Sequence, residues 1–372
     1  MQRFPFLLIF ILTTAFLHAE LPDEIRSSFE PPAEFSGKLG TFRSPLIFDD
    51  GSRVEKAADW PRRRSEILQY WHGAMGAWPP LLEKPALTLL REERGEGFVR
   101  RRVSLEVAPG QRQEGWLLLP DGSGQFPAVL VVYYDPETSA GLAPPEKGAH
   151  RDYGLQLVKR GFVTLSIGTP GGNAWKPELG SAACQPLSFH AYVAANVWTA
   201  MAALPEVDAK RIGIVGHSYG GKWALFGGAL WDKFAAVAVS DPGIVWDEAR
   251  PNINYWEPWY LGLDPALKVQ RKPGVPTETN PRTGPYSRLI KDGRDLTDIH
   301  ALICPRPFLV SGGSEDPLVR WIALNHSRAV NALLGIAEPR VGMTNRKDHT
   351  PDDSANGVLC AFFEHFLKPS SK

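Results

Sequence analysis

The spacing of apolar and polar positions changes near residue 98. Residues 20–96 do not alternate, and their one helical stretch, 60–78, mixes arginines with apolar positions. We interpret 20–96 as an N-terminal extension packed on the core. From residue 98 onward, short apolar runs of strand length are separated by helical stretches, which indicates one further domain over 97–372.

The runs after residue 98 predict an alternation of strands and helices. Strands are expected at 99–107, 115–119, 127–134, 162–167, 211–215, 234–240, 307–311 and 339–343, and helices at 155–160, 190–204 and 321–334. Buried strands separated by helices are typical of a mainly parallel sheet covered on both faces. The pattern therefore predicts an α/β fold.

One long segment, 241–300, interrupts this alternation without a clear periodicity of its own. It is rich in aromatic residues, among them Trp246, Trp256 and Trp259, and it also holds asparagine, arginine and glutamate side chains. Long irregular segments inside a compact domain are usually functional. We expect a cap-like insertion beside an active site.

The first nineteen residues have the pattern of a secretory signal peptide. Arg3 precedes an apolar run over 6–17, which ends at Leu17-His18-Ala19. The run is shorter than the roughly 20 residues that cross a bilayer, so cleavage after Ala19 is favoured over a retained anchor. The sequence thus predicts a secreted or periplasmic protein with no membrane association after cleavage.

Charge and cysteine content narrow the choice of function. The chain carries 41 Lys+Arg and 41 Asp+Glu, a formal net charge of zero, so a nucleic-acid partner is not expected. The three cysteines, Cys184, Cys304 and Cys360, have no zinc-ligand spacing and allow at most one disulfide. We expect small buried cysteines and no metal site.

The strand at 211–215 leads into Gly216-His217-Ser218-Tyr219-Gly220, followed by a helix. A sharp turn between strand and helix presents a serine hydroxyl at the end of the strand, and the two glycines relieve its crowding. The helix N-terminus directs free N–H groups toward a developing oxyanion. Ser218 is the predicted nucleophile.

This arrangement resembles the α/β-hydrolase superfamily, and within it the dienelactone hydrolase and prolyl oligopeptidase-like group. The resemblance covers roughly residues 99–367. It implies an eight-stranded, mostly parallel sheet, a Ser, acid, His triad in that chain order, and no metal or organic cofactor.

Three histidines follow the position at which that order expects the acid: His326, His349 and His365. His326 lies in the helical stretch at 321–334, and His365 lies among phenylalanines. His349 lies in a polar loop after the last strand, where a general base is expected. His349 is the predicted base.

The acid has two main candidates. Asp316 follows the strand at 307–311 in a Gly-Gly-Ser-Glu-Asp-Pro turn that resembles the acid turn of the superfamily, and we choose it. Asp241 follows the preceding strand and is the alternative, with Glu315 as a weaker rival. The oxyanion hole is expected to combine the main-chain N–H of Tyr219 with that of Tyr134 or of its neighbour Asp135. 

The stretch 218–222 is similar to the Ser-Arg-Asn-Gly-Lys segment of glucuronoyl esterases, with Tyr219 where that family has arginine. By this analogy Lys222 binds a sugar hydroxyl, although it could instead pair with a carboxylate. Sugar rings also pack on tryptophan, which makes Trp246, Trp256 and Trp259 candidate substrate contacts.

The sequence therefore predicts a secreted serine esterase of the glucuronoyl or acetyl xylan esterase type. Its expected substrate is an acylated or uronate-esterified plant polysaccharide or a small ester. A prolyl oligopeptidase-like peptidase and a non-catalytic binding protein of the same fold are the alternatives.

Overall fold

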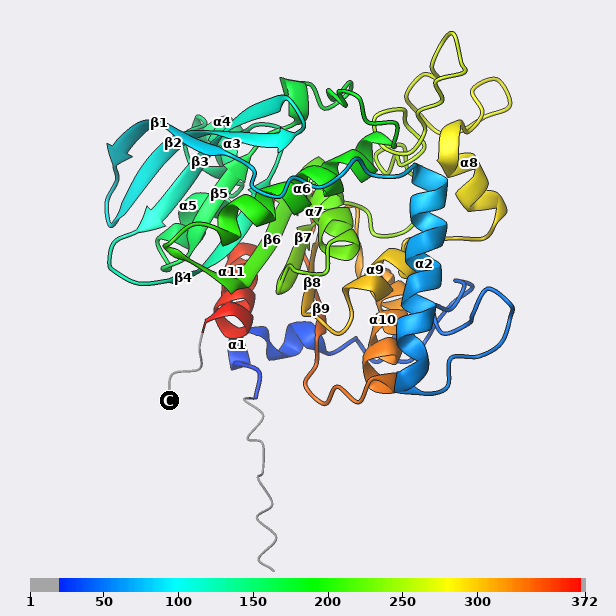
Figure 1. Cartoon of the computed structure of the whole chain (residues 1–372). Coiled ribbons are helices and arrows are strands. Elements are labelled where there is room, and N and C mark those ends of the chain that lie inside the picture. Colours follow the sequence, from blue (N-terminus) through cyan, green and yellow to red (C-terminus); the bar gives the residue numbers. More distant parts are fainter. Residues whose placement is uncertain (1–19, 369–372) are drawn as a thin grey trace, which may run out of the picture.

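The computed structural model describes residues 20–368, so the expected signal peptide at 1–19 lies outside the described residues. Within this range the strands form one sheet in the order β1-β2-β3-β5-β4-β6-β7-β8-β9 (Figure 1). Strands β1, β2, β3 and β5 pair antiparallel, and the remaining pairs are parallel. The sheet is mostly parallel on the side that carries the catalytic candidates, as expected.

The eight predicted strands are all present. Their bounds are β2 (Phe98–Ala108), β3 (Gln111–Pro120), β4 (Phe126–Val132), β5 (Val163–Ile167), β6 (Val207–His217), β7 (Ala236–Ser240), β8 (Phe308–Gly312) and β9 (Val341–Asn345). The expected count of eight is nevertheless wrong for residues 20–368, because β1 (Leu87–Arg94) adds a ninth strand.

Strand β1 belongs to the segment that we interpreted as a strandless extension. Most of its side chains are exposed, so it lacks the buried alternation that marks a strand in sequence. Cross-strand ion pairs join it to β2, including Glu92 with Arg101 at 2.7 Å and Glu93 with Arg100 at 2.8 Å. The sheet therefore begins before residue 96.

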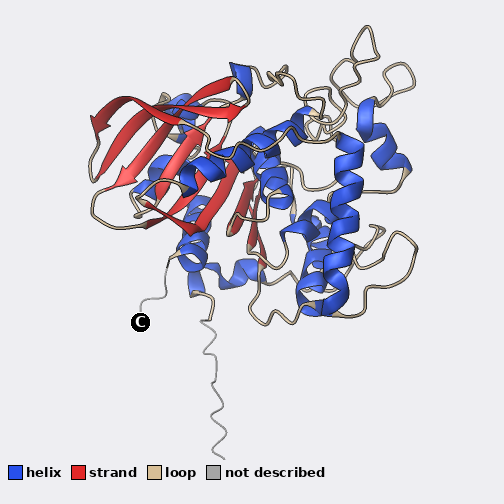
Figure 2. Ribbon diagram, viewed as in Figure 1, coloured by secondary structure: helices blue, strands red, loops and turns tan. Residues whose placement is uncertain are grey.

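Helices cover both faces of the sheet (Figure 2). Their bounds are α1 (Asp23–Arg26), α2 (Trp60–Met75), α3 (Pro136–Ser139), α4 (Pro145–Gly148), α5 (Tyr153–Val158), α6 (Pro186–Ala202), α7 (Tyr219–Leu230), α8 (Gly284–Lys291), α9 (Thr297–Ile303), α10 (Trp321–Leu333) and α11 (Asp353–Leu367). Successive residues of β4 join different cores: Leu130 and Val132 pack with α6, α7, α9 and α10, whereas Val129 and Val131 pack with α5 and α11. This period of two is what a strand buried on both faces requires.

The N-terminal segment is tied to the main domain through α2. Trp71 is fully buried, and its indole N–H donates to Asp298 of α9 at 3.2 Å. Arg63 is equally buried and donates to Asp49 at 2.8 Å. The Trp71 bond therefore joins α2 to α9, and the Arg63 bond joins α2 to the loop before it and gives the buried charge a partner.

The segment between β7 and β8 leaves the sheet at the end of β7, next to Asp241. It is largely irregular up to α8 and returns through α9 (Figure 1). Cys184, Cys304 and Cys360 are buried and unpaired, in line with the sequence. Among the helices of residues 20–368, none combines the length and apolar character of a membrane span.

Candidate active site

Ser218 stands on a strained turn between β6 and α7. Its backbone has φ 55° and ψ −118°, a conformation that residues other than glycine rarely adopt. A Cβ atom on Gly216 would collide with the Gly220 carbonyl, and one on Gly220 would collide with the Val132 carbonyl. The two glycines of the motif are therefore required by close packing, and the serine side chain lies at the strand end.

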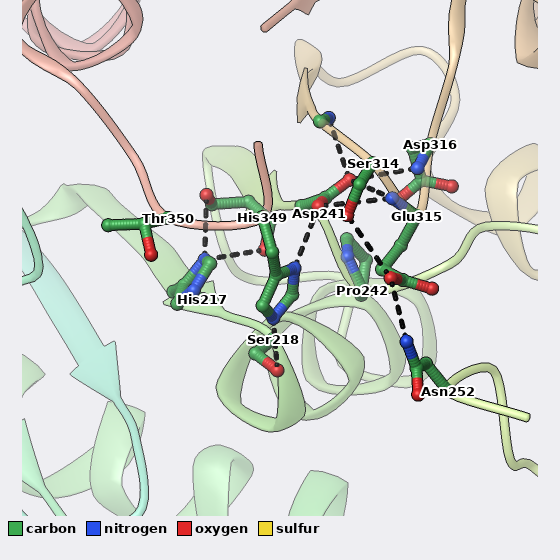
Figure 3. Close-up of polar contacts among 12 residues, drawn as sticks. His217, Ser218, Asp241, Pro242, Asn252, Ser314, Glu315, Asp316, His349 and Thr350 are labelled. Carbon is green, nitrogen blue, oxygen red and sulfur yellow. Dashed lines mark hydrogen bonds and ion pairs between the residues drawn. The ribbon is translucent and has the colours of Figure 1, made fainter. Parts of the chain in front are cut away.

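His349 lies in the loop between β9 and α11 and contacts the serine directly. Its Nε2 lies 2.9 Å from the Ser218 Oγ (Figure 3). The two rival histidines are engaged elsewhere: His326 Nε2 lies 2.9 Å from the Leu39 carbonyl, and His365 Nε2 lies 2.8 Å from a Glu338 oxygen. The geometry thus favours His349 as the base among the three candidates.

Asp241 completes the chain of hydrogen bonds. Its Oδ2 lies 2.8 Å from His349 Nδ1 (Figure 3), and the carboxylate is completely buried. Main-chain N–H groups of Gly313 and Asp316 donate to Oδ1 at 2.7 and 2.8 Å, and that of Glu315 also reaches the carboxylate. The alternative acid of the sequence therefore occupies the position that orients the imidazole.

The choice of Asp316 as the partner of His349 is contradicted by this geometry. The Asp316 carboxylate accepts the main-chain N–H groups of Gly243 at 2.8 Å and Ile244 at 2.7 Å. It thus holds the chain just after Asp241. Glu315 is also no partner for the imidazole: its carboxylate accepts from Asn252 at 3.4 Å.

Burial governs the titration of the groups around the triad. Desolvation, followed by the charge of Asp241, raises the pKa of Asp316 to about 6. Desolvation also holds the pKa of His217 well below its usual value, and the neighbouring His349 adds to that effect. The His217 ring, at the end of β6, packs against the His349 ring with centroids 4.6 Å apart. The base therefore has a neutral imidazole as its neighbour.

Ser218, His349 and Asp241 open into a cleft of about 590 Å³. The cleft also has carboxylate, amide, ammonium and aromatic groups in its walls: Tyr134, Trp175, Lys222, Asn252, Asn254, Glu257, Trp259, Tyr260 and Glu315. The volume is within the range of small-molecule sites, and the mixture of rings and polar groups suits an oxygen-rich ligand.

The three tryptophans of the insertion have different positions. Trp259 lines the cleft, as expected. Trp246 and Trp256 do not line it: their indole N–H groups donate to the carbonyls of Arg294 at 2.6 Å and Gly274 at 2.7 Å, and both rings pack on Tyr286. The expectation of substrate contact is wrong for these two, because they anchor the irregular segment.

Sequence reasoning missed Trp175, which lies in the loop between β5 and α6. It is 62% exposed, lines the cleft, and meets Trp259 edge-on with centroids 4.2 Å apart. Its main-chain N–H donates to the Asn173 side chain at 3.0 Å. The loop has no periodic signal, so only its place beside the other cleft residues identifies it.

Lys222 is buried on the first turns of α7 and lines the cleft. Its ammonium donates to the Pro242 carbonyl at 2.5 Å and lies over the rings of Tyr255 and Tyr260. Burial lowers its pKa to about 8, although nearby carboxylates oppose the shift. Its remaining hydrogens are available to a ligand hydroxyl, and within residues 20–368 it forms no ion pair.

Glu257 is a second buried polar group of the cleft. Its Oε1 accepts the Gly274 N–H at 2.7 Å, whereas Oε2 has no hydrogen-bond partner within residues 20–368. Burial raises its pKa to about 7. An unsatisfied buried carboxyl oxygen in a cleft wall can accept a hydroxyl of a ligand.

The two tyrosines expected at the oxyanion hole, Tyr219 and Tyr134, lie near Ser218. Tyr219 begins α7, so its N–H is one of the free donors of the helix N-terminus, while its side chain is buried with the hydroxyl against His190. The Tyr134 ring packs on the Tyr219 ring in a tilted arrangement, with centroids 4.9 Å apart and an interplanar angle of 33°. Burial raises the pKa of Tyr134, and a hydrogen bond with the Ser218 side chain opposes that rise.

In residues 20–368, no cluster of three or more histidine, cysteine, aspartate or glutamate side chains has the arrangement of a metal site.

Comparisons with known proteins relate the chain to esterases. A family model described as "Esterase FrsA-like" matches residues 92–245, which include Ser218 and Asp241. The 4-O-methyl-glucuronoyl methylesterase 1 of Wolfiporia cocos is 22% identical over 348 residues, which cover 87% of this chain and 80% of that protein. The chain is therefore related in sequence to esterases.

Two solved structures extend the comparison. The glucuronoyl esterase from Solibacter usitatus superposes with a TM-score of 0.67 at 18% identity and covers 88% of this chain and 98% of that one. A mutant glucuronoyl esterase from Sporotrichum thermophile, in complex with methyl 4-O-methyl-β-D-glucopyranuronate, superposes with a TM-score of 0.56 at 16% identity, covering 88% and 87% of the two chains. The fold is that of the α/β-hydrolase esterases. Together the comparisons relate the chain to carboxylic ester hydrolases of the carbohydrate-esterase kind.

Proposed function

We propose that this protein is a serine hydrolase that cleaves carboxylic esters of carbohydrates, with Ser218, His349 and Asp241 as its triad. The observation that carries the proposal is the continuous path from the Ser218 Oγ through the imidazole to the buried Asp241 carboxylate, at 2.9 and 2.8 Å. These are the distances at which a general base activates a serine.

In the proposed reaction Ser218 Oγ attacks the ester carbonyl while His349 Nε2 takes its proton. Asp241 holds the Nδ1–H and stabilises the imidazolium that forms. The same Nε2 then protonates the departing alcohol, which leaves an acyl-enzyme. Water attacks this acyl group and gives its proton to His349, which passes it to the Ser218 Oγ as the Oγ–acyl bond breaks and the acid leaves.

The negative charge on the carbonyl oxygen needs donors on the side away from the base. The Tyr219 N–H is one, and the hydroxyl of Tyr134 is the other that we assign in place of the expected main-chain N–H, because Tyr134 lines the cleft with Ser218 and packs on Tyr219. The family resemblance places an arginine at position 219, whereas this chain buries its tyrosine hydroxyl against His190. A second tyrosine would therefore supply the side-chain donor here.

The cleft supports a uronate ester as the substrate. Lys222 and Glu257 offer a donor and an acceptor for sugar hydroxyls, and Trp175 and Trp259 offer aromatic faces for the ring. The related proteins are named glucuronoyl methylesterases, and one solved relative holds a methyl glucuronate ester. With the signal-like sequence at 1–19, we propose action outside the cytoplasm on plant polysaccharide.

The test is to compare wild-type protein with Ser218→Ala on four substrates: methyl glucuronate ester, acetylated xylan, p-nitrophenyl acetate and a Gly-Pro anilide. The proposal predicts release from the uronate ester and p-nitrophenyl acetate, lost by at least about 10³-fold in the variant. His326→Ala, on α10, is the control and keeps most activity. Anilide cleavage with ester inactivity would contradict the proposal in favour of a peptidase, and inactivity on all four would contradict it in favour of a binding protein.

A further inference from the structure

Arg346 lies in the same loop as His349, between β9 and α11, and its guanidinium is unusual for a buried charge. The residue is 8% exposed, and within residues 20–368 no carboxylate lies within ion-pair distance of it. All its partners are neutral oxygens. It donates to the His349 carbonyl at 2.6 Å, the Thr350 carbonyl at 2.9 Å, the Ser311 carbonyl and hydroxyl at 2.9 and 3.0 Å, the Gly312 carbonyl at 3.2 Å and the Ser240 hydroxyl at 3.2 Å.

These acceptors lie in the loop of the base and at the ends of β7 and β8, which border the triad. His349 and Thr350 are in the loop of the base, and Ser311 is at the end of β8. Ser240 ends β7 and directly precedes Asp241, and its carbonyl accepts the Ser218 N–H at 2.8 Å. One side chain therefore fixes the base loop relative to both the acid and the nucleophile.

An arginine at position 346 suits these acceptors better than a lysine would. Burying a cation without a counter-charge is costly unless every N–H finds an acceptor. The planar fork of arginine presents five N–H groups in fixed directions, whereas lysine has three on a flexible stem. We propose that Arg346 is a positioning residue that holds His349 in register with Asp241 and Ser218. This inference rests on the proposed hydrolase function.

Arg306 offers a matched control at the opposite end of β8. It is half-buried, forms no ion pair within residues 20–368, and donates to the carbonyls of Phe234 and Leu302, both at 3.0 Å, and Trp231 at 3.4 Å. Burial lowers its pKa to about 10. It therefore shares the chemistry of Arg346 but lies away from the triad.

The experiment compares Arg346→Lys with Arg306→Lys in the full chain. Measured are kcat and KM on p-nitrophenyl acetate, the labelling rate of Ser218 by a fluorophosphonate, and the midpoint of urea unfolding. We expect Arg346→Lys to lower kcat and the labelling rate about 100-fold with KM nearly unchanged, the size of loss that a 1 Å misplacement causes. Arg306→Lys is expected to lower the unfolding midpoint with kcat within about twofold of wild type.

Ser311→Ala serves as a second variant if Arg346→Lys does not fold. It removes one acceptor of the guanidinium and keeps the charge, and we expect a loss in kcat of about fivefold with KM unchanged. Equal kcat for the two lysine variants, or an unchanged kcat in Ser311→Ala, would overturn the positioning role while wild-type turnover stands. A wild-type protein that neither cleaves esters nor reacts with the fluorophosphonate would instead contradict the proposed function itself.

Discussion

Strands β7 and β8 are each followed by a buried aspartate, and only one of the two contacts His349. Both aspartates are completely buried, and each carboxylate accepts N–H groups from the other loop: Asp241 from Gly313 and Asp316, and Asp316 from Gly243 and Ile244. Asp241 also faces His349 Nδ1. The two neighbouring buried acids thus have different contacts. Asp241 contacts the imidazole, and Asp316 holds the loop that carries Asp241.

Backbone geometry accounts for the difference. Asp241 has φ 50°, in the left-handed region, and so turns its side chain at once from the end of β7 toward the base. Asp316 stands four residues beyond the end of β8, and its side chain points to the N–H groups after Asp241. That an aspartate follows a strand therefore does not by itself show that it is the partner of His349.

Asp241→Asn gives the largest expected effect. The amide cannot stabilise an imidazolium and favours the wrong tautomer, so kcat on p-nitrophenyl acetate is expected to fall about 10³- to 10⁴-fold. Steady-state kinetics on the purified variant measure it. A loss smaller than that of Asp316→Asn would reverse the two roles.

Gly313→Ala disturbs the same carboxylate from the other loop. An added Cβ would stand 2.7 Å from Asp241 Oδ2 and would collide with the Asp348 carbonyl. We expect kcat to fall about 100-fold, as for a misplaced catalytic group. Gly73→Ala, at an α2 position with no atom within 4 Å of the new Cβ, is the control and should match wild type. Equal activity of the two variants would contradict a tight fit around Asp241.

Asp316→Asn is expected to have a smaller kinetic effect. It weakens the bonds to Gly243 and Ile244, which costs about 1–3 kcal/mol in the free energy of unfolding. Activity depends on this acid only through the neighbouring loop, so kcat should fall about tenfold or less, below the roughly 100-fold cost of a 1 Å shift. Urea unfolding and kinetics on one preparation separate the two effects.

The pH dependence of stability gives the most specific signal for Asp316 and involves no change in kcat. Burial and the charge of Asp241 raise the pKa of Asp316 from 3.8 to about 6. The folded state therefore keeps this proton longer than the unfolded state, and the contribution to stability falls as pH rises through that window. The free energy of unfolding of wild type, minus that of Asp316→Asn, should fall between about pH 4 and pH 6. A difference that grows with pH would contradict an acid whose pKa is raised.

Much of the fold could be predicted because buried strands carry a strong signal. The eight strands from β2 to β9 are apolar runs, whereas β1 is exposed and held by Arg–Glu pairs, so its polar sequence resembled a loop. Ser218 and His349 could be proposed from the sequence because a glycine-flanked turn and a polar loop after the last strand are local features, and the structure brings the two side chains into contact.

The acid and the aromatic contacts could not be resolved in the same way. Asp241 and Asp316 have similar local sequences, and their roles depend on which loop supplies N–H groups to which carboxylate. The role of each tryptophan depends on distant partners: Trp246 and Trp256 donate to carbonyls far along the chain, and Trp175 meets Trp259 across two loops. Tertiary contacts decide these cases, and periodicity does not report them.

The central claim is that Asp241 accepts the Nδ1–H of His349. Proton NMR of protein labelled with ¹⁵N-histidine observes this proton directly, because a strong hydrogen bond to a carboxylate shifts it far downfield. The account predicts a downfield His349 Nδ1–H signal in wild type and in Asp316→Asn, and its loss in Asp241→Asn. A signal that survives in Asp241→Asn and disappears in Asp316→Asn would contradict it.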